Sequence, residues 1–471
     1  MKSYDECDGL DLAGLVASGK ASPRELLDEA IRRARAVQER LNPISQWHEE
    51  HARAAIDAGL PDGPFRAVPL LLKDLTALKG TPTWSGSRLG QKQQPAAIDA
   101  TLVERYKRAG LVIFGKTTTP ELGIAPSTET TLTGSTRNPW DPSRTAGGSS
   151  GGATAAVAAR VVPIAHASDG GGSIRIPASC CGVFGMKPTR ARNPSGPLAG
   201  EGWGGMSVNH VVTRSVRDSA AILDATHGPA PGDPYFAPPF AGKFLDEVGK
   251  PPKKLRVALQ LRPFSGVAVD PECVAAAESA AKLMEELGHS VEPAMPEVNW
   301  TELSDGSWVV IASNVRLAVL LMNGGAEPAR GVVDRVVQEA VDFARTLPGD
   351  AYPMGMRAIH RFGRLMAGFH EKYDVLLSPT LAKPPLPLGA LHTDNLDLAA
   401  WREALLSFMP FTAPWNMSGQ PSMSVPLHWT AAGLPVGVMF TAAFGEDALL
   451  FRLAGQLEAA RPWAGRVPAA A

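Results

Sequence analysis

The chain has 471 residues, of which 44% are hydrophobic and 20% charged, and its formal net charge is −1. This apolar content is ample for a large core, whereas the near-zero charge provides no electrostatic attraction to nucleic acid or to an anionic membrane surface. Glycine and proline (47 and 41 residues) exceed their usual share without forming a repeat, which indicates long shaped loops and excludes a fibrous protein.

The first part of the chain alternates helix and strand signals. Ser22-Pro-Arg-Glu25 is a capping box with proline at the first helical position, and it begins an apolar-faced helix. The apolar run 68–72 is typical of a strand buried on both faces. A helix over 101–109 ends at a glycine and leads into a strand over 111–114. This alternation predicts an α/β protein whose central sheet is flanked by helices.

Long loops interrupt the later alternation. Residues 117–152 are rich in Thr, Ser, Pro and Gly, and a loop of this length in a compact enzyme is usually functional. A helix over 153–160 and a strand over 161–167 follow. We expect one domain over 1–471, with residues 228–400, which include a Pro- and Gly-rich stretch and a weakly periodic one, as a variable part that covers the substrate.

The N-terminus and the cysteines favour a cytoplasmic protein. Residues 1–8 are acidic and lack the apolar segment of a signal peptide, and we find no apolar run of about 18 residues that would suggest a membrane span. The four cysteines are Cys7, Cys180, Cys181 and Cys273. They form no C-x-x-C pair, and so few thiols in a long chain suit a reducing compartment.

Lys73 directly follows the buried run 68–72. Lysine is almost never fully buried unless it is paired, and desolvation lowers its pKa so that it can act as a base. Taken alone, such a lysine more often emerges from the sheet into solvent.

Two glycine-rich stretches each hold a serine. Gly147–Gly152 contains Ser149 and leads into a helix, where glycines permit unusual backbone conformations and N–H groups are free. It is followed by core-like residues, which argues against a linker, and it lacks the spacing of a phosphate loop. In Asp169–Pro177, three glycines precede Ser173. Successive N–H groups can there hold an oxyanion, although a plain tight turn has the same composition.

Together these stretches resemble the amidase-signature family. Ser149 and Ser173 lie 24 residues apart, and Lys73 precedes Ser149 by 76. Further matching segments are 115–117, 136–140, 185–189 and 416–426. The resemblance implies a mixed central β-sheet flanked by helices on both faces, and an amide-bond hydrolase that needs no metal or other cofactor.

The resemblance also implies roles for the polar residues. Ser173 would be the nucleophile, Ser149 the bridging serine, typically preceded by a cis peptide bond, and Lys73 the base. The expected oxyanion donors are the N–H groups of three consecutive glycines, Gly170, Gly171 and Gly172, together with that of Ser173. Three residues depart from those usual in the family, Ala67, Ala146 and Gly170. None of them removes a reactive group, but glycine at 170 is smaller than usual and leaves the shape of the oxyanion loop open.

The expected substrate is a small neutral or apolar amide, such as a linear or cyclic amide oligomer, an anilide or a carbamate, as in bacterial stand-alone amidases. We name Gly123, Ala125 and Trp203 as substrate contacts. Other partners are not expected, whether nucleic acid or membrane, and association as a homodimer is left open.

Several alternatives remain. His166 and Asp169 lie near Ser173 and permit a Ser-His-Asp hypothesis, although His166 ends an apolar strand and fits a core position better. The stretch 48–51 is not a complete metal motif and fits a solvated helix face. Two functional rivals are the glutaminase subunit of a tRNA-dependent amidotransferase and a non-catalytic adaptor with an amidase fold.

Overall fold

The computed structural model describes residues 3–469, and within this range eleven strands form one mixed sheet. In sheet order they are β1 (Ile44–Trp47), β3 (Val112–Thr117), β2 (Pro69–Lys73), β6 (Ile164–Asp169), β8 (Val208–Thr213), β7 (Phe184–Lys187), β12 (Ser422–Trp429), β13 (Pro435–Ala442), β11 (Val375–Pro379), β9 (Arg256–Leu259) and β10 (Ser290–Pro293). The pairs β3–β2–β6 and β11–β9–β10 are parallel, and the others are antiparallel.

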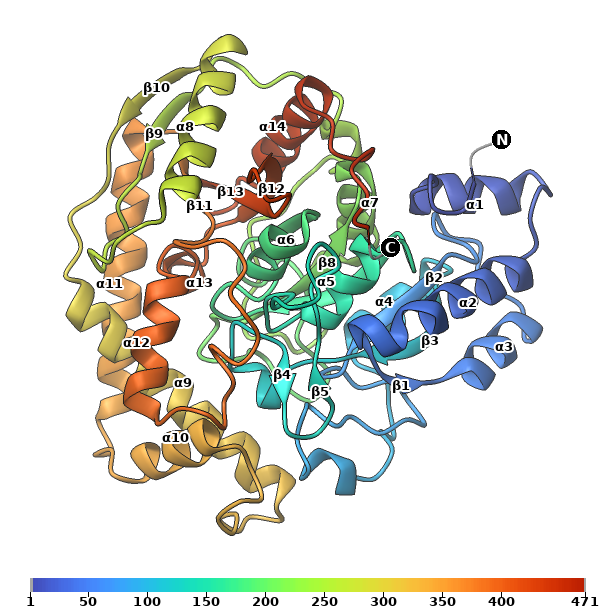
Figure 1. The fold of residues 1–471 in the computed structure, drawn as a ribbon, viewed down its shortest axis with the longest axis horizontal. Helices are drawn as coiled ribbons and strands as arrows, with labels where there is room; N and C mark the ends of the chain where they lie inside the picture. The colour runs from blue at the N-terminus through green and yellow to red at the C-terminus, as the bar shows by residue number, and fades with distance from the viewer. Residues whose placement is uncertain (1–2, 470–471) are drawn as a thin grey trace.

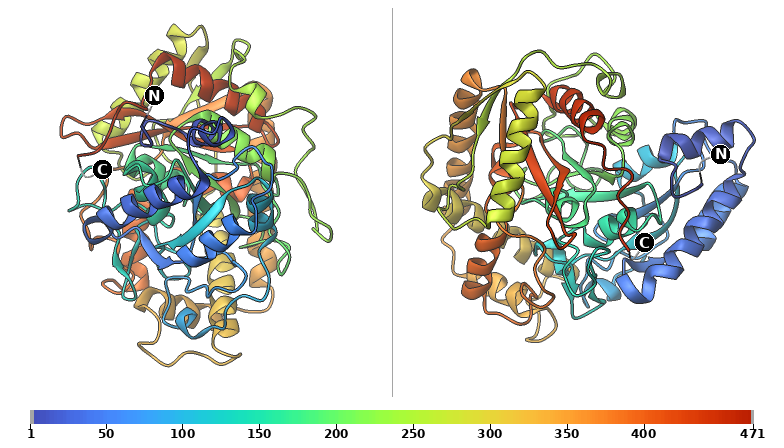
Figure 2. Two further views of the ribbon diagram at one scale, coloured as in Figure 1. Left: turned by 90° about the vertical axis from the view of Figure 1, so that its right-hand side faces the viewer. Right: turned by 45° about the horizontal axis from the view of Figure 1, so that its top comes forward.

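Helices cover both faces of this sheet (Figures 1 and 2). Those in the first half are α1 (Gly9–Ala17), α2 (Pro23–Leu41), α3 (Glu49–Asp57), α4 (Thr101–Arg108), α5 (Gly151–Ala158), α6 (Arg175–Cys181) and α7 (Val216–Thr226). Those in the second half are α8 (Pro271–Glu286), α9 (Trp300–Met322), α10 (Arg335–Arg345), α11 (Ala351–Lys372), α12 (Leu398–Phe408), α13 (Pro414–Ser418) and α14 (Asp447–Ala460). The predicted fold class, a mixed α/β sheet flanked by helices, is confirmed.

Strand β2 shows why the chain places Lys73 in the interior. Leu71 packs in the core cluster that contains residues of α2 and α5, whereas Leu70 and Leu72 pack in the cluster that contains residues of α1 and α4. Side chains alternate across a strand, so a strand between two helical layers needs apolar residues at every position. All of β2 is buried, and Lys73 is its last residue.

The predicted start of α2 is confirmed, whereas the predicted strand over 161–167 begins later than expected. The α2 capping box forms as predicted, with Ser22 and Glu25 bonded to each other's backbone N–H groups. The predicted strand over 161–167 is β6, which begins only at Ile164. The N–H of Val161 still donates to Ala156 at the end of α5, and Pro163 has no N–H to contribute to the ladder.

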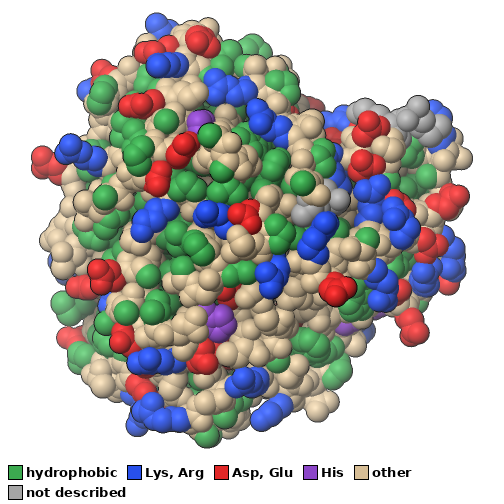
Figure 3. Space-filling model, in the orientation of Figure 1, with side chains coloured by type: hydrophobic (Ala, Val, Ile, Leu, Met, Phe, Trp, Pro, Cys, Tyr) green, Lys and Arg blue, Asp and Glu red, His purple; other side chains and the backbone are tan. Residues whose placement is uncertain are grey.

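Residues 300–400 are the part of the predicted substrate cover 228–400 in which apolar residues recur with little periodicity. They are mostly helical. Helix α9 in this segment is long and apolar enough to cross a membrane, with a mean hydropathy of 1.3 in its most apolar window. Such a helix was not predicted from the sequence. In the fold, α9 packs against α10 and α11. One face of the molecule, shown in Figure 3, carries acidic and basic side chains interspersed, in keeping with the near-zero net charge.

Candidate active site

Lys73 lies at the centre of a group of hydroxyls. Its Nζ is 2.7 Å from Ser149 Oγ and 2.9 Å from Ser150 Oγ and Ser168 Oγ. The side chain is fully buried, and this burial lowers its pKa to about 7, against a smaller opposing effect of the Asp169 carboxylate. Near neutral pH a large fraction of Lys73 is therefore uncharged and able to accept a proton from a serine.

The loop that carries Ser149 is packed too closely for larger residues. The peptide bond Gly148–Ser149 is cis, as expected by resemblance. A Cβ on Gly148 would lie 2.7 Å from the backbone of Ser127, and one on Gly152 would lie 2.5 Å from the carbonyl oxygen of Pro43. The glycines of this motif thus let the loop lie against neighbouring backbone, which directs Ser149 towards the end of β2.

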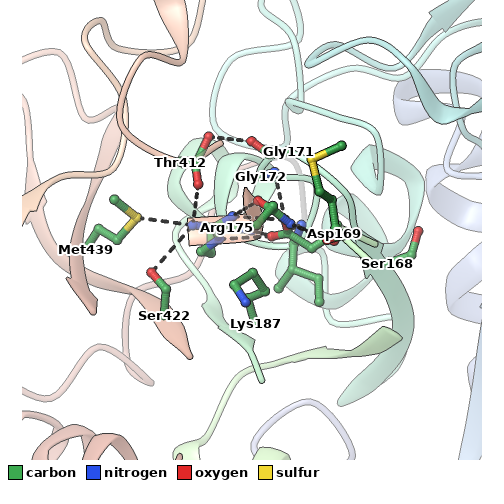
Figure 4. A network of polar contacts seen from close by, with 12 residues as sticks. Ser168, Asp169, Gly171, Gly172, Arg175, Lys187, Thr412, Ser422 and Met439 are labelled. Atoms are coloured by element: carbon green, nitrogen blue, oxygen red, sulfur yellow. Dashed lines mark hydrogen bonds and ion pairs between the residues drawn. The ribbon is translucent and has the colours of Figure 1, made fainter. Parts of the chain in front are cut away.

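The loop that carries Ser173 is braced by a buried ion pair, drawn in Figure 4. Arg175 Nη2 donates to Asp169 Oδ1 at 2.9 Å, and Arg175 Nη1 donates to the carbonyl of Thr412. Asn416 Nδ2 donates to both the backbone and the side chain of Asp169. Burial alone would raise the pKa of Asp169, but the Arg175 charge and hydrogen bonds outweigh it and hold the pKa at about 2. The network ties the Ser173 loop to the segment around α13.

One of the three glycines predicted as oxyanion donors already donates its N–H group to a carboxylate of the protein. The N–H of Gly172 donates to Asp169 Oδ1 at 2.7 Å, so it is not available to an oxyanion. The N–H groups of Gly170, Gly171 and Ser173 make no hydrogen bond within the described part of the chain, and these three residues line the cavity. The expectation for Gly172 is therefore corrected. An aspartate three residues before it is a known turn-former whose carboxylate accepts N–H groups of the turn, a signal that the sequence did contain.

A cavity of about 100 Å³ adjoins Ser173, and its walls are largely apolar. The three predicted substrate contacts, Gly123, Ala125 and Trp203, all line it. A Cβ on Gly123 would lie 3.3 Å from Ser149 Oγ, so glycine at this position lets the cavity wall approach the hydroxyl of Ser149 closely. Much of the remaining wall comes from α9, with Trp300, Trp308 and Ile311, and from α12 and the residue that follows it, with Trp401, Leu405 and Met409. The α12 residues were not predicted from the sequence.

Comparison with known proteins decides the family. The family model described as Amidase matches residues 25–451. This chain belongs to the amidase family. It is 38% identical to the 6-aminohexanoate-cyclic-dimer hydrolase of Pseudomonas sp. (strain NK87) over 479 aligned residues, covering 98% of this chain and 96% of the relative. It is also 38% identical to the acylamidase of Rhodococcus erythropolis, with the same coverage.

The fold comparison agrees with the sequence comparison. A solved structure of 6-aminohexanoate cyclic dimer hydrolase superposes on this amidase with a TM-score of 0.93 and 35% identity, covering the whole of both chains. The predicted family, its fold and its class as an amidase are confirmed.

His166 does not form a Ser-His-Asp triad in this amidase. Its Nδ1 accepts the backbone N–H of Lys73 at 3.2 Å, and its ring is fully buried, which lowers the pKa of the imidazole to about 3. Asp169, the proposed partner, is bonded to Arg175. His166 therefore supports the backbone that carries Lys73.

Gly170 is explained by its contact with Trp203. A Cβ on Gly170 would lie 2.8 Å from Trp203 Cε3 and 2.9 Å from Cζ3. Trp203 itself has φ of 52°, a left-handed conformation that non-glycine residues seldom adopt. Glycine at position 170 lets this indole lie directly against the loop that carries Ser173 and close one side of the cavity.

We expect Gly170→Ala to lower the kcat/KM of the amidase about tenfold, because overpacking by one methyl typically costs about 1–3 kcal/mol and here falls on the oxyanion loop. In a Trp203→Ala background the same change should have little effect, since the clashing ring is gone. Steady-state kinetics on a chromogenic anilide measure both. Gly14→Ala is the control, because a Cβ there meets nothing within 4 Å. Equal losses from Gly170→Ala in both backgrounds would contradict the explanation.

Proposed function

We propose that this amidase hydrolyses a small neutral or apolar amide through Ser173, Ser149 and Lys73. The observation that carries the proposal is the buried lysine at hydrogen-bond distance from Ser149, 2.7 Å, with a pKa lowered to about 7. Ser173 lines the cavity together with Gly123, whose Cβ position is 3.3 Å from Ser149 Oγ. A neutral amine in contact with one serine, and a second serine exposed to a substrate cavity, are the parts that a serine relay requires.

In the proposed reaction, Ser173 attacks the amide carbonyl while its proton passes to Ser149 and that of Ser149 passes to Lys73. The tetrahedral oxyanion accepts hydrogen bonds from the free N–H groups of Gly170, Gly171 and Ser173. Ser149 then protonates the leaving nitrogen and recovers a proton from Lys73. Water repeats the cycle on the acyl-enzyme, so no metal or organic cofactor is required.

One contact of this relay is not formed in the free enzyme. The hydroxyl of Ser173 makes no hydrogen bond with Ser149 or with any other described residue. Catalytic hydrogen bonds of this kind often tighten only when the substrate is bound. The proposal therefore requires Ser173 to turn towards Ser149 in the substrate complex.

The substrate class rests on the cavity and on the relatives. The cavity of about 100 Å³ is lined mainly by apolar side chains, and its polar walls come chiefly from serine and backbone. Relatives named for hydrolysis of a cyclic amide dimer and for acylamidase activity support a stand-alone amidase. We also propose that the helical part of residues 228–400 covers the substrate within a single domain, because α9, with Trp308, belongs to it. The same range also supplies β9, β10 and β11 to the central sheet.

Two rivals are less well supported. A glutaminase must bind the α-ammonium of glutamine, yet within the described residues no Asp or Glu lines the cavity. An adaptor has no need of a buried lysine held among three serines. The four cysteines are buried and form no disulfide within the described residues, which supports a cytoplasmic location. Association as a homodimer stays a prediction.

A substrate panel tests the proposed function. We expect hydrolysis of anilides, carbamates and linear or cyclic 6-aminohexanoate oligomers, with little hydrolysis of glutamine. A fluorophosphonate should add covalently to Ser173, which peptide mass mapping detects, and the Ser173→Ala variant should stay unlabelled. Efficient glutamine hydrolysis that rises with a co-purified protein would instead identify an amidotransferase subunit.

A further inference from the structure

Among the described residues that line the cavity beside Ser173, Arg402 is the sole charged side chain. It comes from α12, next to the fully buried Trp401, which also lines the cavity. Its side chain is 32% exposed. An otherwise apolar substrate cavity with one permanent cation in its wall is an asymmetric binding site, and a small number of placed polar groups usually fixes ligand orientation in such cavities.

The neighbours of Arg402 hold its guanidinium in place without accepting hydrogen bonds from it. Its carbon lies 5.0 Å from the ring centre of Trp308 on α9, a cation–π contact that fixes the side chain against the cavity wall. Its nearest carboxylate, Asp305, is 3.6 Å away, beyond hydrogen-bond distance. Asp305 is 68% exposed, so this ion pair is strongly screened by water. Arg402 donates no hydrogen bond within the described residues, and its five N–H donors stay available.

The surroundings suit an anion with an apolar body. Ser304 lies one residue before Asp305 and one helical turn before Trp308, and it lines the same cavity. Leu405 and Leu406, one helical turn after Arg402 on α12, supply an apolar part of the wall. A carboxylate matches the planar fork of a guanidinium with two parallel hydrogen bonds, which a neutral amide group cannot do as well.

We propose that Arg402 binds a carboxylate carried by an otherwise apolar amide substrate, so that the enzyme favours such anionic amides over neutral ones of the same length. This inference rests on the proposed function, because Ser173 must cleave the amide bond of the same molecule. It extends the substrate class beyond neutral amides and assigns the specificity to one residue outside the Ser-Ser-Lys relay.

Matched substrates measure this preference. One series carries the carboxylate on the acyl side: the mono-para-nitroanilides of succinate, glutarate and adipate, each paired with the alkanoyl anilide of equal chain length. The other carries it on the amine side: an N-acyl para-aminobenzoate paired with the N-acyl aniline. For each pair the readout is the ratio of kcat/KM for the anionic member to that for the neutral member.

Two variants on the same contact should shift this ratio in opposite directions. Arg402→Gln removes the cation and should lower the ratio about tenfold in at least one series, mainly through KM, which is the lower end expected for a charge-assisted hydrogen bond. Asp305→Asn removes the competing carboxylate and should raise the ratio. Arg335→Gln, on α10 and paired with Glu339 outside the cavity, is the control and should leave it unchanged. Added salt should narrow the difference between the wild-type enzyme and Arg402→Gln.

The outcomes separate this inference from the proposed function. If Arg402→Gln leaves the ratio of kcat/KM between anionic and neutral members unchanged in both series, the proposed role of Arg402 is wrong. An equal loss of kcat/KM on both members of each pair counts as such a result, and the proposed amidase activity would still hold. Hydrolysis that survives Ser173→Ala would instead overturn the proposed function.

Discussion

Ser173→Ala and Ser149→Ala should each lower kcat by about 10⁴-fold or more while the fold stays intact. Ser173 supplies the attacking oxygen, and both proton transfers of the proposed mechanism pass through Ser149, so no other group replaces either hydroxyl. Losses of this size are typical when one member of a catalytic unit is removed.

The stability of the two variants should change little. The Ser173 hydroxyl makes no hydrogen bond with a described residue, so its removal leaves no partner unsatisfied. Ser149→Ala loses the contact with Lys73, worth about 1 kcal/mol, but Ser150 and Ser168 still surround the amine. Circular dichroism and thermal melts check the fold, and a chromogenic anilide assay measures kcat.

Two further variants complete this experiment. Ser18→Ala, at the exposed end of α1, is the control and should match the wild-type enzyme. His166→Ala tests the competing triad, and activity should persist in it to the extent that the fold does. Near-wild-type activity in Ser149→Ala together with its loss in a folded His166→Ala would show that the Ser-Ser-Lys assignment is wrong.

The reacting residues were predictable because each leaves a local signal. Lys73 follows an apolar run that has to be buried on both faces, and the glycines beside Ser149 and Ser173 indicate loops packed against backbone. These patterns extend over only a few residues, so they can be read without knowledge of the tertiary fold. The same holds for the first strands of the central sheet, β2 and β3, which alternate with the helices α2 and α4.

The cavity walls were not predictable in the same way. Arg402 and Trp401 reach the cavity from α12, more than 200 residues after Ser173, and nothing in their local sequence separates a cavity wall from a core face. The contact between Gly170 and Trp203 likewise depends on how two loops meet. Gly172 shows a third case, in which a donor with the right sequence is directed away from the cavity by the carboxylate of Asp169.

Lys73→Met should abolish activity yet leave the protein as stable as the wild type, or more stable, at neutral pH. Methionine keeps most of the length of the side chain and removes the group that accepts the proton. Lys73→Arg should be inactive as well, because a guanidinium cannot serve as a base. The matched control is Lys116→Met, since Lys116 is buried on the neighbouring strand β3 and contacts Asp74, Pro82 and Thr83 but none of the active-site serines. It should keep activity in whatever fraction folds.

The pH dependence of activity follows from the lowered pKa. Burial brings the pKa of Lys73 from 10.5 to about 7, so the neutral amine accumulates as the pH rises through 7. For the wild-type enzyme, kcat/KM should therefore rise with pH through this value and reach a plateau above it. A profile that is flat between pH 6 and about 9 would contradict the role of Lys73 as the base.

The pH dependence of stability has a definite sign. Between about pH 7 and 10.5 the unfolded chain holds a proton on Lys73 that the folded chain does not, so the free energy of unfolding contributed by this group rises with pH. Below pH 7 both states are protonated, and the cost of burying the charge acts in full, at roughly 1.4 kcal/mol per unit of pKa depression. Lys73→Met lacks this cost, although it leaves three serine hydroxyls with fewer partners. The melting temperature of Lys73→Met minus that of the wild type should thus be highest near or below pH 7. This difference should fall as the pH approaches 10.5. Thermal melts of both proteins across this range measure the difference, and a variant that melts far below the wild type at pH 7 would show that Lys73 is a stabilising cation and not a buried base.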